Sequence, residues 1–219
     1  MLLAIFGRSW QYYAMVLPAV LICITFHEVC HGYVAYLLGD ETAKEAGRLT
    51  LNPIKHLDLV GALCMVVAGV GWAKPVPIDP RRMWKMKNRK LAISLTALAG
   101  PLSNMLLAFL LFFAYLEIAA NVPGGFLSAL GEFLYITAYL SVGLAAFNLL
   151  PIPPLDGSKI LFPLLPNRVI AVTAKYERYI SLAFFALILM GVLNKPIELI
   201  RSGILQGMSA ALSWIIHLL

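Results

Sequence analysis

Charged side chains are scarce in this chain of 219 residues. Asp, Glu, Lys and Arg make up 13% of the sequence, against about 25% in soluble globular proteins, whereas 61% of the residues are hydrophobic. Mean hydropathy is +0.84, and the apolar residues form long blocks rather than short alternating runs. A water-soluble domain of this length cannot hide so much apolar surface. The composition therefore excludes a soluble domain and indicates an integral membrane protein.

Cysteine and concentrated positive charge are also in short supply. The three cysteines, Cys23, Cys30 and Cys64, lie in apolar segments without a paired framework, which excludes a disulfide scaffold and indicates buried hydrophobic residues. The net charge of +6 comes from basic residues in short connectors between apolar blocks. That distribution is typical of membrane topology signals, so we expect no nucleic-acid partner.

Long apolar blocks are what the chain has in abundance. Four of them, residues 12–38, 91–116, 126–150 and 203–219, approach or exceed the length of about 20 residues that crosses a bilayer, and residues 179–193 form a shorter fifth. Residues 59–73 are short and contain three glycines. Because the connectors on both sides of this stretch contain Lys and Arg, we expect it to re-enter the membrane rather than span it. The same rule places the N-terminus outside.

The sequence therefore predicts an all-α integral membrane protein. We expect about five transmembrane helices, one re-entrant segment and a small extended (β) element in a single domain, residues 1–219. Its catalytic core is expected over about 12–157, with accessory C-terminal helices over about 179–219.

The first apolar block contains the pattern H-E-x-x-H, formed by His27, Glu28 and His31. Residues four apart on a helix share one face, so both histidines can hold the same metal ion. Glu28 lies close enough to reach a water molecule on that metal, where a carboxylate can serve as general base. A polar cluster that merely packs helices is the alternative, but a buried carboxylate without a partner is costly in a membrane.

A third metal ligand is expected at Asp156. It follows the segment Pro151-Ile152-Pro153-Pro154 at the end of an apolar block, where the prolines prevent the helix from continuing. Unwound backbone at membrane depth is tolerated where it lines an enclosed cavity. A plain proline turn leaving the membrane is the alternative, although the histidine pair favours the ligand role.

Two motifs resemble those of the site-2 protease family of intramembrane zinc metalloproteases, namely HEVCH at residues 27–31 and NLLPIPPLDG at residues 148–157. The segments LNPIKHLD, GWAKPVP and GPLSN also look like that family. The resemblance runs from about residue 12 to residue 157. It is closest to a short form without a PDZ or nucleotide-sensing domain.

The resemblance implies one zinc ion per chain, bound by His27, His31 and Asp156, with Glu28 as general base. Asn104 and Asn148 resemble polar positions near the family's active site, where they would orient substrate or stabilise an oxyanion. Hydrogen bonding between helices is the alternative for both. The implied activity is hydrolysis of peptide bonds in or near the transmembrane segments of membrane-anchored proteins.

The partners implied are a single-span membrane protein or a remnant peptide as substrate, together with membrane lipid, and an oligomer is compatible with the sequence. The topology places the active site nearer the cytoplasmic face, in what we expect to be a prokaryotic cell membrane.

An extended segment is expected to bind the substrate. Two prolines at alternate positions in GWAKPVP forbid a helix and suit an edge strand. We expect its first residues, Gly71, Trp72, Ala73 and Lys74, to pair with unwound substrate by strand addition. An ordinary amphipathic connector is the alternative for this segment.

Two other functions fit parts of the sequence. A non-catalytic membrane protein could use the same three ligands for zinc binding or zinc transport. A membrane metalloprotease acting on soluble or lipidated peptides would keep the zinc site but would need a wide aqueous chamber. A serine protease is disfavoured because no Gly-x-Ser-x-Gly-like nucleophile occurs.

Overall fold

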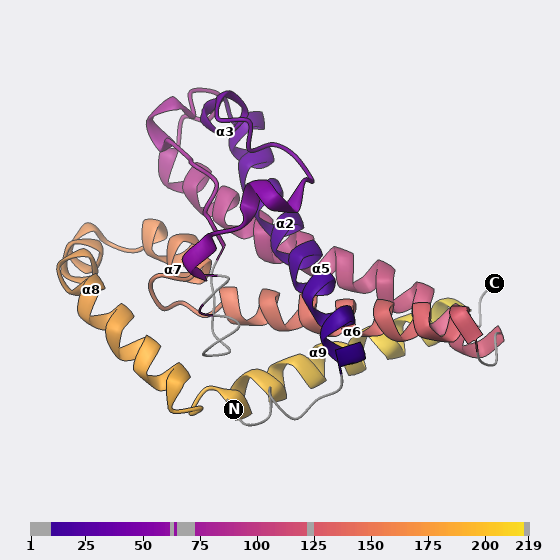
Figure 1. The fold of residues 1–219 in the computed structure, drawn as a ribbon. Helices are drawn as coiled ribbons and strands as arrows, with labels where there is room; N and C mark the ends of the chain where they lie inside the picture. Colours follow the sequence, from indigo (N-terminus) through magenta and orange to yellow (C-terminus); the bar gives the residue numbers. More distant parts are fainter. Residues whose placement is uncertain (1–9, 62–63, 65–72, 122–124, 217–219) are drawn as a thin grey trace.

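The structure is a computed structural model that describes residues 10–61, 64, 73–121 and 125–216. Helices dominate this part of the chain (Figure 1). In chain order they are α2 (Trp10–Leu37), α3 (Thr42–Glu45), α5 (Arg89–Asn121), α6 (Gly125–Asn148), α7 (Asp156–Leu161), α8 (Asn167–Leu189) and α9 (Asn194–Ile216). Three short 3-10 turns join them, η1 (Pro53–His56), η2 (Pro80–Arg82) and η3 (Phe162–Leu164).

Three of the described helices are long and apolar enough to cross a membrane. The qualifying segments are Tyr12–Leu37 in α2, Arg89–Ala119 in α5 and Gly125–Asn148 in α6. They coincide with the predicted spans at 12–38, 91–116 and 126–150. Helices α8 and α9 qualify only as a pair, with a bend of 81° between them. Three or four crossings follow from the described residues, so the predicted number of about five is not confirmed.

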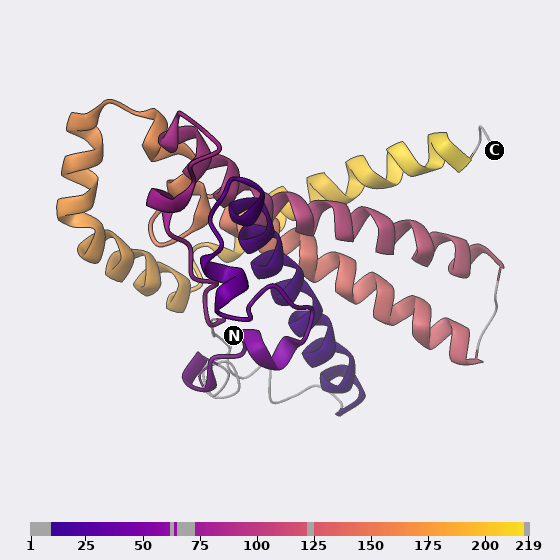
Figure 2. The ribbon, with the colours of Figure 1, turned by 90° about the horizontal axis from the view of Figure 1, so that it is seen from above.

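Charge within the last two helices explains the difference. The predicted span at 179–193 covers the second half of α8 and the turn after it, and the first half of α8 carries Arg168, Lys175, Glu177 and Arg178. Helix α9 likewise carries Glu198 and Arg201 ahead of its most apolar stretch. In Figures 1 and 2, α8 lies at the edge of the molecule.

The predicted extended element is not confirmed either. Among the described residues there is no strand, only an isolated antiparallel bridge between Leu57 and Ala73. The Lys74 N–H donates a hydrogen bond to the His56 carbonyl at 2.9 Å beside this bridge. The prediction of a re-entrant segment at 59–73 falls largely on residues 62–63 and 65–72, which lie outside the described residues.

Small residues allow the central helices to pack closely, as is typical of helix contacts in membranes. One buried cluster joins α5, α6 and α9 through Ala108, Phe112, Ala138, Val142, Met208 and Leu212. Between α5 and α6, the Ser141 hydroxyl donates to the Asn104 carbonyl at 2.9 Å. Helix α2 packs against both α5 and α6. This packing brings the middle of α2 against the segment of α5 that contains GPLSN.

Buried polar residues hold the connector between residues 73 and 79 in place. The Asp40 carboxylate, fully buried after α2, accepts hydrogen bonds from the Thr42 N–H at 3.0 Å and the Asp79 N–H at 2.6 Å. The Arg48 guanidinium donates to the Lys74 carbonyl at 2.6 Å. The connector is therefore anchored at both ends to the loop after α2, which places its middle over the site described next.

Candidate metal centre

Helix α2 presents His27 and His31 on one face, one helical turn apart, and the start of α7 brings Asp156 against them. The distance from Asp156 Oδ2 is 2.9 Å to His27 Nε2 and 3.1 Å to His31 Nε2, and the two Nε2 atoms are 3.0 Å apart. All three side chains are buried. Asp156 is 129 residues from His27 and 125 residues from His31 in the sequence. The fold nevertheless brings the three side chains together at one point.

The proline-rich turn after α6 makes this convergence possible. Helix α6 ends at Asn148, and the chain turns through Pro151–Pro154 before α7 begins at Asp156. A Cβ atom at Gly157 would overlap the backbone carbonyl groups of Leu149 and Leu150. Only glycine fits at this position, so the Asp-Gly pair places the carboxylate while the backbone folds tightly behind it.

The three ligand atoms have the spacing that a tetrahedral zinc site needs. Zinc bonds to histidine nitrogen and carboxylate oxygen are about 2.0–2.2 Å long, so two ligand atoms in a tetrahedron lie about 3.3 Å apart. The three distances here, 2.9 to 3.1 Å, are close to that edge length. Three protein ligands also leave the fourth position open, as in catalytic zinc sites. The donor set therefore fits zinc.

A hydrogen bond outside the cluster sets the tautomer of His31. Its Nδ1 lies 2.7 Å from the Thr96 carbonyl oxygen of α5, which can only accept. Nδ1 therefore carries the hydrogen, and the Nε2 lone pair of the neutral ring faces His27 and Asp156. Metal-binding histidines usually donate their other ring N–H in this way.

The carboxylate of Asp156 is held in its charged form. Burial alone raises the pKa of this carboxyl group, but the two neighbouring histidine rings, when they are protonated and donate to it, outweigh burial and bring the pKa below its usual range. The Lys159 ammonium, one turn along α7, lies 3.4 Å from Asp156 Oδ1. A carboxylate also binds a metal ion in its ionised form.

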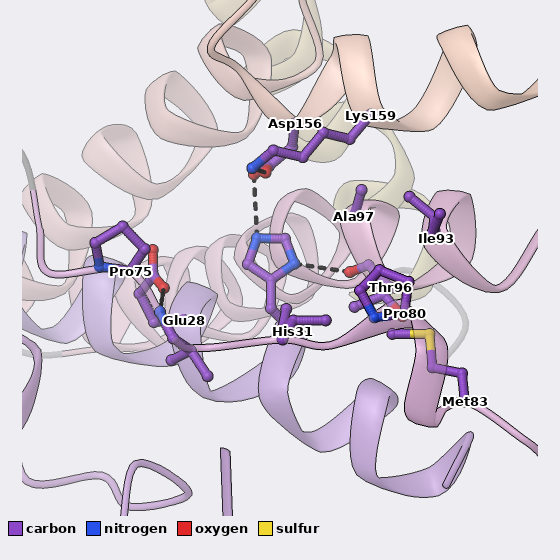
Figure 3. A pocket seen from close by; sticks show the side chains of 12 residues that line it. Glu28, His31, Pro75, Pro80, Met83, Ile93, Thr96, Ala97, Asp156 and Lys159 are labelled. Atoms are coloured by element: carbon purple, nitrogen blue, oxygen red, sulfur yellow. Dashed lines mark hydrogen bonds and ion pairs between the residues drawn. The ribbon is translucent and has the colours of Figure 1, made fainter. Parts of the chain in front are cut away.

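Glu28 lines the same cavity from the other side. The cavity measures about 310 Å³, and its walls include Glu28, His31, Asp156 and Lys159. Figure 3 shows His31 in the middle, Asp156 above it and Glu28 beside Pro75 of the connector. The Glu28 Oε2 atom accepts a hydrogen bond from the Val76 N–H at 2.8 Å. Glu28 is thus kept apart from the three clustered ligand atoms, as expected of a general base rather than a ligand.

Gly100 of α5 packs directly on the histidine pair. A Cβ atom there would lie 2.5 Å from His31 Cε1 and 2.7 Å from His27 Cε1, closer than real Cβ contacts. The glycine of GPLSN therefore lets the backbone of α5 approach the two rings.

We expect Gly100→Ala to weaken zinc binding because the methyl group must displace both rings. Overpacking costs about 1–3 kcal/mol, or about a 5- to 150-fold loss of affinity if it falls on the zinc-bound state. Chelator competition on detergent-purified protein measures this loss. Gly203→Ala in α9, where an added Cβ meets no atom within 4 Å, is the matched control. Equal affinities for the two variants would contradict this role for Gly100.

The two asparagines have different surroundings. Asn104, fully buried in α5, places its side-chain amide nitrogen Nδ2 3.2 Å from His27 Nδ1. Asn148 donates instead to the Leu144 carbonyl of its own helix at 3.0 Å. The structure thus brings Asn104 to the metal cluster, whereas the side chain of Asn148 bonds within its own helix. Their predicted contacts with substrate stay predictions.

The predicted substrate-binding residues are only partly described. Gly71 and Trp72 lie outside the described residues. Ala73 forms the bridge with Leu57, and the backbone of Lys74 is bonded on both sides, to the His56 carbonyl and to Arg48. These contacts hold the segment close to Glu28, because Val76, two residues after Lys74, donates its N–H to the Glu28 carboxylate.

Three residues of the site were not predicted from the sequence, namely Thr96, Lys159 and Val76. Thr96 and Val76 act through their backbone groups, which every residue type except proline provides, so their side chains gave no signal in the sequence. Lys159 could have been found, because it lies one helical turn after Asp156 in a segment that restarts as a helix.

Comparisons with known proteins support the family that the two motifs suggest. The family model described as "Peptidase family M50" matches residues 116–191. "Putative zinc metalloprotease YwhC" of Bacillus subtilis is 44% identical over 171 residues, which cover 77% of each chain. "Putative zinc metalloprotease Rip2" of Mycolicibacterium smegmatis is 30% identical over 191 residues, covering 84% of this chain and 70% of its own. A relative with a similar name in Methanocaldococcus jannaschii is 34% identical over 138 residues, 62% of this chain and 63% of its own. No solved structure matches the chain.

Proposed function

Since the chain belongs to peptidase family M50, the site-2 protease family, and is a zinc metalloprotease, we propose that it hydrolyses peptide bonds in or near the transmembrane segments of membrane-anchored proteins. The membership confirms the family resemblance of HEVCH and NLLPIPPLDG. It also removes the reason to retain a non-catalytic zinc-binding or transport role. The substrate class, a single-span membrane protein or remnant peptide, is part of the proposal.

The observation that carries the proposal is the position of the candidate metal centre. His27 and His31 lie within Tyr12–Leu37, a segment long and apolar enough to cross the bilayer. A peptide bond that reaches these side chains must come to the same depth. The described cavity, about 310 Å³, is too small for a folded domain and suits a short unwound stretch of chain.

In this proposal His27, His31 and Asp156 hold one zinc ion per chain. A bound zinc ion supplies a Lewis acid that polarises the peptide carbonyl and makes water a stronger acid. Glu28 takes a proton from the attacking water and passes it to the leaving nitrogen. The Val76 N–H fixes one Glu28 oxygen at 2.8 Å and thus directs the carboxylate while it exchanges the proton.

We also propose an orientation in the membrane. Both connectors contain Lys and Arg, three of them in 39–58 and seven in 74–90, and these residues favour the cytoplasmic side. Helix α2 then enters from outside, and the metal centre lies nearer the cytoplasmic face of a prokaryotic cell membrane. Labelling of a cysteine placed at Lys85 from the outside of intact cells would contradict this orientation.

The connector is proposed to bind the unwound substrate. Beside the bridge of Leu57 and Ala73, the Lys74 N–H points toward His56. Backbone groups alternate in direction along an extended chain, so those of Ala73 face the opposite edge, where a further strand can pair. Gly71 and Trp72 are kept in the same proposal on the basis of the sequence alone.

The test is cleavage of single-span membrane proteins that carry a tag at each end. Purified chain in lipid vesicles should release fragments whose new termini, mapped by mass spectrometry, lie within or beside the transmembrane segment. Ala73→Pro, which removes the N–H at the proposed edge, should reduce cleavage without changing the zinc content, and Ala73→Ser should not. Cuts confined to soluble regions would contradict the function. Full activity of Ala73→Pro would contradict only the proposed pairing of substrate with the backbone edge at Ala73, not the proteolytic function.

A further inference from the structure

The side chain of Asn104 lies against the ligand histidine His27. It is fully buried in α5, and its Nδ2 atom lies 3.2 Å from His27 Nδ1. Its Oδ1 atom is buried and has no hydrogen-bond partner among the described residues. One end of this amide faces His27 and the other has no partner among these residues in either orientation, so its contact with His27 must decide which atom faces the ring.

The chemistry of His27 decides the orientation. A neutral imidazole has one N–H and one lone pair, and the Nε2 lone pair must face the metal. Nδ1 then carries the hydrogen and needs an acceptor, which an NH₂ group is not. The oxygen and nitrogen of an amide exchange places by a half-turn of the group and are told apart only by their hydrogen bonds. That half-turn places Oδ1 at the position 3.2 Å from Nδ1.

We infer that Asn104 is a positioning residue for the zinc site, whose Oδ1 accepts a hydrogen bond from the His27 Nδ1–H and so holds the Nε2 lone pair toward the metal. The inference rests on the proposed zinc ligation by His27. It makes the two histidines equivalent, because the Thr96 carbonyl does the same for His31 at 2.7 Å. Both outer acceptors come from α5, eight residues apart on either side of Gly100.

Two other roles for Asn104 agree less well with its contacts. An oxyanion donor must face the substrate, but Asn104 is fully buried and is absent from the walls of the cavity that holds Glu28. A residue that only joins helices has no need of its amide here, since the bond to α6 runs from the Ser141 hydroxyl to the Asn104 backbone carbonyl.

Three variants separate these roles by zinc affinity, measured by chelator competition on detergent-purified protein. Asn104→Leu has a similar size but cannot accept, and we expect zinc affinity to fall about 10- to 100-fold, as for other outer partners of metal-binding histidines. Asn104→Asp accepts at the same position but cannot donate when ionised, and we expect it to stay within a few-fold of the parent. Ser141→Ala, which removes the contact to the backbone of the same residue, is the control and should match the parent.

Each outcome decides the inference. Parental affinity in Asn104→Leu would overturn it, because the amide would then serve only to pack. Affinity as weak in Asn104→Asp as in Asn104→Leu would also overturn it, because the required group would be a donor. If Asn104→Leu does not fold, Asn104→Asp still tests the inference, because a large loss of zinc affinity in that variant would overturn it. Absence of zinc from the parent would instead refute the zinc site itself, a result distinct from failure of the asparagine role.

Discussion

Replacing Glu28 with glutamine is expected to abolish cleavage while leaving zinc binding intact. Glutamine has the same shape, and its side-chain oxygen can still accept the hydrogen bond from the Val76 N–H. It cannot take up a proton, however, and a positioned general base contributes about 10²- to 10⁴-fold to the rate. The measurement is the initial rate on a tagged single-span substrate, with zinc determined on the same preparation.

Glu41→Gln is the matched control for this prediction. Glu41 is an exposed acid in the connector after α2, so its replacement makes the same chemical change away from the cavity. We expect the parental rate. A Glu28→Gln variant that cleaves as fast as the parent would show that another group takes the proton. Loss of zinc from that variant would show that Glu28 is a ligand.

Removal of a ligand is the second large effect. In His27→Ala or Asp156→Ala, two of three donors remain, and the metal loses a direct bond rather than an outer partner. We expect the affinity to fall by more than the roughly 10- to 100-fold that an outer partner costs. His56→Ala is the control, since His56 is also buried but bonds to the Thr50 carbonyl at 2.8 Å, away from the cluster. Zinc loss from this control as large as from the ligand variants would contradict the assignment.

Hydropathy predicted the first three spans well because each contains a long apolar stretch with few charges. Helices α2, α5 and α6 extend a few residues beyond or short of the predicted limits. The last two helices differ because charged residues such as Lys175 and Arg201 belong to the same helices as the apolar stretches. The bend of 81° between α8 and α9 lies at a short break between them, and a hydropathy profile does not contain such an angle.

In the candidate site, too, some features could be predicted from the sequence and others depend on how the helices pack. His27 and His31 share a helical face by spacing alone, and the prolines before Asp156 predict an unwound chain there. That Asp156 lies 2.9 Å from His27 is a property of the fold. Asn104 and Asn148 are the same type of residue in similar apolar blocks, yet one contacts His27 and the other its own helix. Residue type could not separate them, because the difference arises from how α5 faces α2.

The central claim is that His27, His31 and Asp156 bind one catalytic zinc ion, with Glu28 outside the ligand set. The most direct test is the zinc content per chain of detergent-purified parent, His27→Ala, Asp156→Ala and Glu28→Gln, because it requires no known substrate. The account predicts about one zinc ion in the parent and in Glu28→Gln, and loss of zinc from the other two. A folded parent without zinc, or full zinc retention in Asp156→Ala, would contradict it.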